Sequence, residues 1–129
     1  MDTDKKRIRI IMHGCNGKMG QVISGLLASD AEAVIVAGVD ARDDGHNPYP
    51  VFQNIKDCDV EADCLIDFSA VSAVDDMLDY CVERKLPCVL CTTGLSETQL
   101  QKASDAAKQI AVLRSANMSL GINLFLKLL

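Results

Sequence analysis

The sequence predicts an α/β fold in which helices cover both faces of a doubly wound, mostly parallel sheet. Strand-like and helix-like stretches alternate along the whole chain, and this alternation favours parallel strands joined by right-handed crossovers. The run AVIVAGV, residues 33–39, is continuously apolar, as expected for a strand buried on both faces. A glycine-rich loop also separates the first strand-like run from the first helical one.

Size and charge narrow the class of protein before any motif is considered. The chain has 129 residues, and its 49% hydrophobic and 24% charged residues are typical of one globular domain. A net charge of -5 argues against a nucleic-acid-binding surface. The sequence shows no apolar run of membrane-spanning length and no signal-peptide pattern, so we expect a cytoplasmic protein without a membrane partner.

The first half of the chain contains a predicted βαβ unit. Residues 7–13 form the first expected strand, and residues 18–28 form a helix because their apolar side chains recur at spacings of three and four. Residues 33–39 form the second strand, and the loop at 41–50 is rich in Gly, Pro, Asn and Asp.

The second half continues the alternation. Ser96 and Gln99 have the spacing of a capping box at the start of a helix. The other expected elements are a weak strand at 51–53, a strand at 64–68, a helix at 70–84, a strand at 88–91, a helix from 97 to about 109, a strand at 111–113 and a helix beginning at 120.

The six cysteines do not indicate disulfides or a metal site. Nothing in the chain suggests secretion, so free thiols are expected. Cys88 and Cys91 form a CxxC pattern, but it lies in a predicted strand, where side chains three apart point to opposite faces. We therefore expect no metal.

Ligands of such sheets bind beyond the carboxyl ends of the strands. This rule selects five segments that directly follow predicted strands: 13–20, Asp40, 67–69, 92–94 and 115–119. His13 could contact a phosphate there, but a strand-end histidine with an internal partner is the favoured interpretation.

The glycine-rich loop HGCNGKMG resembles the turn that holds a pyrophosphate in Rossmann-like domains. Gly17 and Gly20 match the last two glycines of the GxGxxG pattern, whereas Cys15 stands at the first and Gly14 is displaced by one. Such a turn places a helix N-terminus against an anion. A tight strand-to-helix connection without a ligand is the alternative.

Asp40 ends the second strand, 20 residues after Gly20, where a carboxylate can accept hydrogen bonds from an adenosine ribose. Its charge would repel the 2'-phosphate of NADP, which favours NADH. Arg42 and Lys18 could offset that charge, so both NADH and NADPH remain open as cofactors.

Several segments together resemble the N-terminal domain of dihydrodipicolinate reductases, also called 4-hydroxy-tetrahydrodipicolinate reductases. They are GCNGKMG, LIDFS, CTTGLSETQ and SANMSLGINLFLKLL. The resemblance implies an oxidoreductase of diaminopimelate and lysine biosynthesis that transfers a hydride from NADH or NADPH to a cyclic dicarboxylate. It also implies a full-length homotetramer, whereas this fragment would be a monomer or weak dimer.

The resemblance also implies a division of the chain into a dinucleotide-binding domain, 1–118, and the start, 119–129, of a helix leading to an absent substrate and tetramerisation domain. No catalytic residue is then expected in this chain, which should bind cofactor but be inactive alone. The implied cofactor residues are Gly14, Cys15, Asn16, Gly17, Lys18, Met19, Asp40, Arg42, Phe68, Thr92, Thr93, Gly94, Ser115, Ala116, Asn117 and Met118.

Two other functions stay open at this point. A different dehydrogenase with this fold, acting on a semialdehyde or an inositol, would share the glycine loop and Asp40 but not the TTG and SANMS segments together. A free-standing module that senses a nucleotide or CoA is the non-enzymatic alternative.

Overall fold

The computed structural model describes residues 7–28, 32–42 and 45–115, and within them six strands form one sheet. Every neighbouring pair is parallel, in the order β3-β2-β1-β4-β5-β6. The strands are β1 (Ile8–His13), β2 (Ala33–Val39), β3 (Val51–Phe52), β4 (Cys64–Asp67), β5 (Cys88–Leu90) and β6 (Val112–Arg114). This strand order is that of a Rossmann-like, doubly wound sheet, which confirms the predicted fold class.

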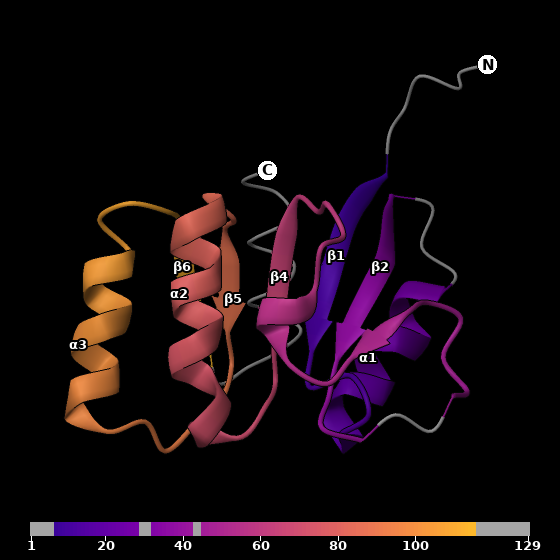
Figure 1. Ribbon diagram of the computed structural model, residues 1–129, viewed down its shortest axis with the longest axis horizontal. Helices are drawn as coiled ribbons and strands as arrows, with labels where there is room; N and C mark the ends of the chain where they lie inside the picture. Colours follow the sequence, from indigo (N-terminus) through magenta and orange to yellow (C-terminus); the bar gives the residue numbers. More distant parts are fainter. Residues whose placement is uncertain (1–6, 29–31, 43–44, 116–129) are drawn as a thin grey trace.

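Three α-helices flank the described part of the sheet: α1 (Lys18–Ala28), α2 (Val74–Arg84) and α3 (Glu97–Ala106). Two short 3-10 helices, η2 (Ile55–Asp57) and η3 (Val71–Ala73), lie in the connections. Helix α1 contacts β1 and β2, whereas α2 and α3 pack against each other (Figure 1).

Alternate residues of the central strand β1 point into two separate hydrophobic cores. Ile10 and Met12 belong to the core that contains Ile23 of α1, and Ile11 belongs to the core that contains Met77 of α2. The sheet is therefore apolar on both faces, with helices on both, as the run AVIVAGV predicted.

The same alternation separates the CxxC cysteines. Cys88 lies in the core on the α2 side, and Cys91 lies in the core on the α1 side. All six cysteines are buried, and none of them forms a disulfide. Their side chains contribute to packing.

The predicted helix at 70–84 begins differently from the expectation. Its first turn is the 3-10 helix η3, and the α-helix starts only at Val74. Neither Ala70 nor Ala73, the two N-cap residues, makes a side-chain capping hydrogen bond, so nothing there fixes an α-helical first turn. By contrast, the predicted capping box of Ser96 and Gln99 is present at α3, although this helix ends at Ala106 instead of near 109.

The apolar stripe of α1 is wider than the surface it buries. Ile23 and Leu27 pack on the sheet, but Val22 and Leu26 are 45% and 61% exposed. The helix meets the sheet along the line of Gly20, Ile23 and Leu27, and residues to one side of this line stay in solvent.

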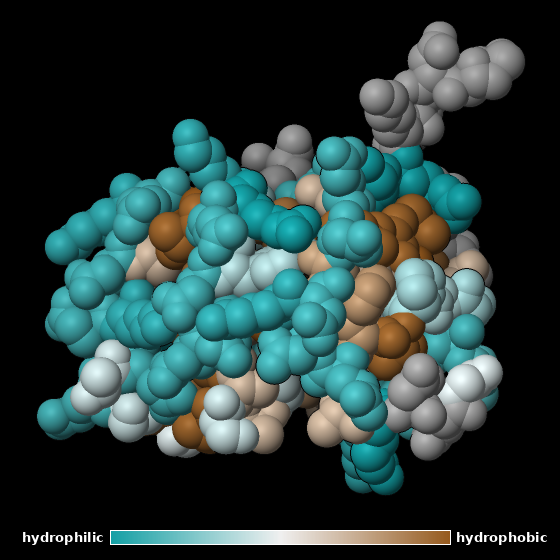
Figure 2. All heavy atoms as spheres, in the orientation of Figure 1, coloured by the Kyte–Doolittle hydropathy of each residue, from teal (hydrophilic) through white to brown (hydrophobic). Residues whose placement is uncertain are grey.

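The opposite side of the molecule, over α2 and α3, is largely hydrophilic (Figure 2). No helix of the described residues is long and apolar enough to cross a membrane. The carboxyl ends of the strands, where the candidate ligand-binding segments lie, form the lower edge of the sheet in Figure 1.

Candidate functional site at the carboxyl edge of the sheet

The loops at the carboxyl edge are tied to neighbouring strands by backbone hydrogen bonds. The N–H of Gly14 donates to the carbonyl of Val39 (2.7 Å), and the N–H of Phe68 donates to the carbonyl of His13 (2.9 Å). Similar bonds join the loop after β5 to β4 and the residue after β6 to β5. The loops therefore start from fixed positions at adjacent strand ends.

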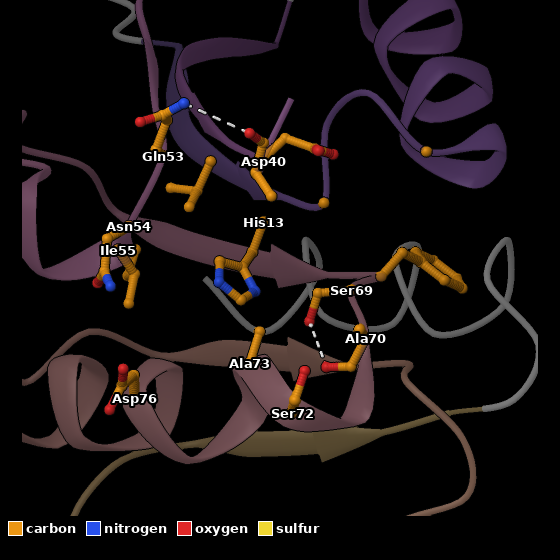
Figure 3. A pocket seen from close by; sticks show the side chains of 15 residues that line it. His13, Asp40, Gln53, Asn54, Ile55, Ser69, Ala70, Ser72, Ala73 and Asp76 are labelled. Carbon is orange, nitrogen blue, oxygen red and sulfur yellow. Dashed lines mark hydrogen bonds between the residues drawn. The ribbon is translucent and has the colours of Figure 1, made fainter. Parts of the chain in front are cut away.

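Two cavities open along this edge and contain many of the predicted residues. The first, of about 480 Å³, lies between the glycine loop, the end of β2 and the start of α2 (Figure 3). The second, of about 350 Å³, lies at the ends of β5 and β6. Predicted residues lining the first are Gly14, Gly17, Asp40 and Phe68, and those lining the second are Thr92, Thr93, Gly94 and Ser115.

The first two glycines of the loop differ in what surrounds them. Gly14 has a φ of 88°, and a Cβ there would overlap the carbonyl oxygen of Phe68. The N–H of Gly17 donates to the carbonyl of Gly14 (3.1 Å), which closes the turn. A Cβ on Gly17 would meet only that carbonyl, at 3.4 Å, so its other side is open to the cavity.

Helix α1 begins immediately after this turn, at Lys18. The N–H groups in the first turn of a helix lack intrahelical acceptors and lie at the positive end of its dipole. No acidic residue occupies this first turn to compete for them. The side chains of Lys18 and Met19 are exposed and line neither cavity, so their contribution to the edge is their backbone.

Asn16 has a role that the sequence does not reveal. Its side chain is buried, donates from Nδ2 to the carbonyl of Arg42, and accepts at Oδ1 from Nδ2 of Asn47 (2.7 Å). These bonds fasten the glycine loop to the loop that follows β2. Asn16 therefore holds the two loops in position relative to each other.

Cys15 also points away from the cavities. Its thiol is fully buried, and a Cβ on Gly38 would lie 2.6 Å from Cys15 Sγ and 2.6 Å from Tyr49 Cε1. Gly38 of β2 thus provides the space that the cysteine needs. Only the backbone of Cys15 is left to face a ligand.

Asp40 is held in place by the backbone around it. Its Oδ2 accepts from the N–H of Asn16 and its Oδ1 accepts from the N–H of Arg42, each at 3.0 Å. A carboxylate offers about four lone-pair sites, so with these two donors, the ones that the described residues supply, one site on each oxygen remains for a ligand. The Arg42 side chain is exposed and lies outside the lining of the cavity.

A buried polar network connects the two cavities. Asp67, at the end of β4, is fully buried and bonds through Oδ1 to His13 Nδ1 (2.6 Å) and the Ser69 hydroxyl (2.6 Å). Its Oδ2 accepts from the Thr92 hydroxyl (2.6 Å), which in turn accepts from the N–H of Ser69 (2.9 Å). The internal partner expected for His13 is therefore Asp67, which the sequence selected only as part of the strand-end segment 67–69.

The second cavity is lined by apolar, hydroxyl-bearing and charged residues, which are Leu90, Cys91, Thr92, Thr93, Gly94, Arg114 and Ser115. Gly94 has a φ of 79°, which a glycine tolerates, and it lies beside the exposed Thr93. Burial raises the pKa of the adjoining Cys91 thiol to about 12. This cavity therefore contains no reactive thiolate at neutral pH.

Some residues of the first cavity were not predicted. Gln53, Asn54 and Ile55 follow β3, so the rule about carboxyl ends would have found them had it been applied to the weak strand as well. Ser72, Ala73 and Asp76 come from η3 and α2, and no sequence signal marks them.

Three predicted residues, Ala116, Asn117 and Met118, lie outside the described part of the chain. Within the described residues, no group of three or more His, Cys, Asp or Glu side chains is placed to hold a metal ion.

Solved structures share this fold. A dipicolinate-bound dihydrodipicolinate reductase from Paenisporosarcina sp. TG-14 has a TM-score of 0.72 at 24% identity, over 87% of this chain and 48% of that one. A myo-inositol 2-dehydrogenase from Lactobacillus plantarum has a TM-score of 0.74 at 14% identity, over 85% of this chain and 36% of that one.

Sequence comparison is more specific than the fold. The 4-hydroxy-tetrahydrodipicolinate reductase of Clostridium novyi is 47% identical over 116 residues, which are 90% of this chain and 46% of the relative. The chain thus spans about half the length of the curated relatives it matches. The family model described as "Dihydrodipicolinate reductase, N-terminus" matches residues 8–118. This match extends over most of the chain and includes the glycine loop and both cavities. The chain therefore belongs to the family of dihydrodipicolinate reductase N-terminal domains.

Proposed function

We propose that this chain binds NADH or NADPH along the carboxyl edge of its sheet and is the cofactor-binding part of a 4-hydroxy-tetrahydrodipicolinate reductase. The observation that carries the proposal is the position of Asp40, fixed by two backbone N–H groups beside an open glycine turn. Family membership supports it over a semialdehyde or inositol dehydrogenase, because the family model that matches residues 8–118 is that of dihydrodipicolinate reductases.

The glycine loop fits the pyrophosphate of such a cofactor. Gly17 leaves its cavity side open, and the first turn of α1 offers unpaired N–H groups with no acidic side chain nearby in that turn. We assign the pyrophosphate contacts to the backbone from Gly14 to Met19.

Asp40 fits the adenosine ribose. The lone pairs that its two backbone donors leave free can accept from the ribose hydroxyls. In NADPH the 2'-phosphate would meet this carboxylate, so NADH should bind more tightly unless the exposed Arg42 and Lys18 supply enough counter-charge.

The second cavity fits the nicotinamide half. We assign its ribose and ring to Thr92, Thr93 and Gly94, and the carboxamide end to the segment from Ser115 to Met118. When bound, the cofactor supplies the hydride, and the protein supplies orientation and electrostatics.

The whole reductase would pass this hydride to a cyclic dicarboxylate in diaminopimelate and lysine biosynthesis, in the cytoplasm. The matched region is only about half of the Clostridium novyi relative, so we assign substrate binding and homotetramer contacts to the remainder of such a protein. The chain by itself should be a monomer or weak dimer with cofactor affinity and no turnover.

Calorimetric titration of the 129-residue chain with NADH and, separately, NADPH tests the proposal. We expect binding of at least one nucleotide at micromolar to sub-millimolar strength. CoA is the comparison ligand, because a CoA-sensing module would bind CoA and neither nicotinamide cofactor. Binding of CoA alone would therefore replace the proposed function, and failure of both nicotinamide cofactors would refute it.

A further inference from the structure

His13 is almost completely buried, and one of its two ring nitrogens has no partner among the described residues. Its side chain is 4% exposed, and Nδ1 lies 2.6 Å from Oδ1 of the fully buried Asp67. The described part of the chain offers Nε2 no hydrogen-bond partner. Every fully buried side-chain nitrogen or oxygen of the described residues has a partner, so Nε2, which has none, is not sealed in the core and can be reached from the cavity that His13 lines.

Asp67 determines how the imidazole is oriented. Its carboxylate also accepts from the hydroxyls of Ser69 and Thr92, both at 2.6 Å, so its position is fixed from three sides. The Nδ1–H of His13 donates to this carboxylate, which leaves Nε2 on the opposite side of the ring. Asp67 is a positioning residue for the histidine.

The free nitrogen belongs to a residue that lines the first cavity. Figure 3 shows the imidazole projecting into the space between Asn54, Ala73 and Ser69. Gly14 and Gly17 line the same cavity with their backbone, and Asp40 lines it with a carboxylate that retains free lone pairs. These are groups suited to phosphate and ribose oxygens.

We propose that His13 is a cofactor-binding residue whose Nε2 forms a hydrogen bond with an oxygen atom of the sugar–phosphate backbone of the dinucleotide. This inference rests on the proposed function, because it assumes that a dinucleotide occupies the first cavity. A phosphate oxygen would accept from a doubly protonated ring. A ribose hydroxyl would instead donate to a neutral one.

The chain has only two histidines, which makes a direct spectroscopic test practical. Long-range ¹H–¹⁵N NMR of the imidazole nitrogens gives one set of signals for each ring, and a His46→Asn variant assigns them. We expect NADH to shift the Nε2 signal of His13 and to leave the His46 signals unchanged. Inorganic pyrophosphate and adenosine, titrated separately, then distinguish a phosphate contact from a ribose contact.

A substitution provides the second measurement. Asparagine places its amide nitrogen close to where Nδ1 of histidine lies, so His13→Asn keeps a donor for Asp67 while it removes the outer part of the ring that contains Nε2. Loss of one ligand hydrogen bond should raise the Kd of NADH about tenfold. The matched variant His46→Asn, in the exposed loop before β3, should bind NADH as the parent does.

The outcomes separate this inference from the proposed function. If NADH binds the parent chain but leaves the Nε2 signal in place, the inference is wrong and the proposed function stands. If neither NADH nor NADPH binds, both are wrong. The spectra use the unmodified chain, so a His13→Asn variant that fails to fold does not prevent the decision.

Discussion

Helix α1 contains two glycines for which the structure predicts opposite effects of the same substitution. A Cβ on Gly20 would overlap the carbonyl oxygen of Gly14 and lie 2.8 Å from both Cα and O of Cys15. A Cβ on Gly25 would meet no atom within 4 Å. Gly20→Ala and Gly25→Ala therefore differ only in what surrounds the added methyl group.

The size of each effect follows from these surroundings. Alanine is favoured over glycine inside a helix by about 1 kcal/mol, so Gly25→Ala should stabilise the chain by about that amount. Gly20→Ala has the same propensity gain, but overpacking costs about 1–3 kcal/mol. Because its neighbours are backbone atoms that cannot rotate away, we take the upper end of that range and expect a net loss of about 2 kcal/mol.

Urea unfolding followed by far-ultraviolet circular dichroism measures both variants against the parent. With equal m-values, the two free energies of unfolding should differ by about 3 kcal/mol, a large part of the stability of a domain this size. Gly20→Ala should also weaken NADH binding, since the helix must move away from the glycine loop. A Gly20→Ala chain as stable as the Gly25→Ala chain would refute the close packing of α1 on this loop.

Three further predictions concern ionisable side chains. Asp40→Asn should raise the Kd for NADH about tenfold and that for NADPH much less, because the carboxylate favours the ribose hydroxyls and repels the 2'-phosphate; calorimetry showing equal losses would remove Asp40 from the ribose site. Asp67→Asn should lower the free energy of unfolding by about 3 kcal/mol in urea titrations, since its three donors lose a buried carboxylate, and an unchanged midpoint would contradict the network. Burial raises the pKa of the Cys64 and Cys91 thiols from 9.0 to about 12. The unfolded chain therefore releases these protons at a lower pH than the folded chain, and the free energy of unfolding should fall as the pH rises from 9 towards 12. Equal urea midpoints at pH 8 and pH 10.5 would contradict this prediction.

Local patterns in the sequence were sufficient for most elements of the fold. Residues 18–28 and 33–39 were predicted with the bounds that the structure gives α1 and β2, because each pattern is set by burial against one sheet. The helix predicted at 70–84 was less accurate at its start, where no side chain caps the first turn and η3 forms in place of an α-helical turn.

The candidate site was predictable where it depends on the backbone near each residue. The glycine pattern located Gly14 and Gly17, and the end of a strand located Asp40, because turns and strand ends have local sequence signals. The partner of His13 could not be predicted in this way. Asp67 is 54 residues away, and only the pairing of β1 with β4 makes the two side chains neighbours.

That pairing also explains why one carboxylate can serve two cavities. In the parallel register His13 lies opposite Asp67 on β4, and Asp67 lies opposite Leu90 at the end of β5. Neighbouring strands are about 4.8 Å apart, so the sheet sets the distance from the glycine loop to the TTG loop at about two such spacings. Because Asp67 bonds to His13 through one oxygen and to Thr92 through the other, a change at Asp67 acts on both loops. A change in either loop alone leaves this spacing intact. The affinity for each half of an extended ligand can therefore be altered separately, while the strands keep the distance between the two binding sites constant.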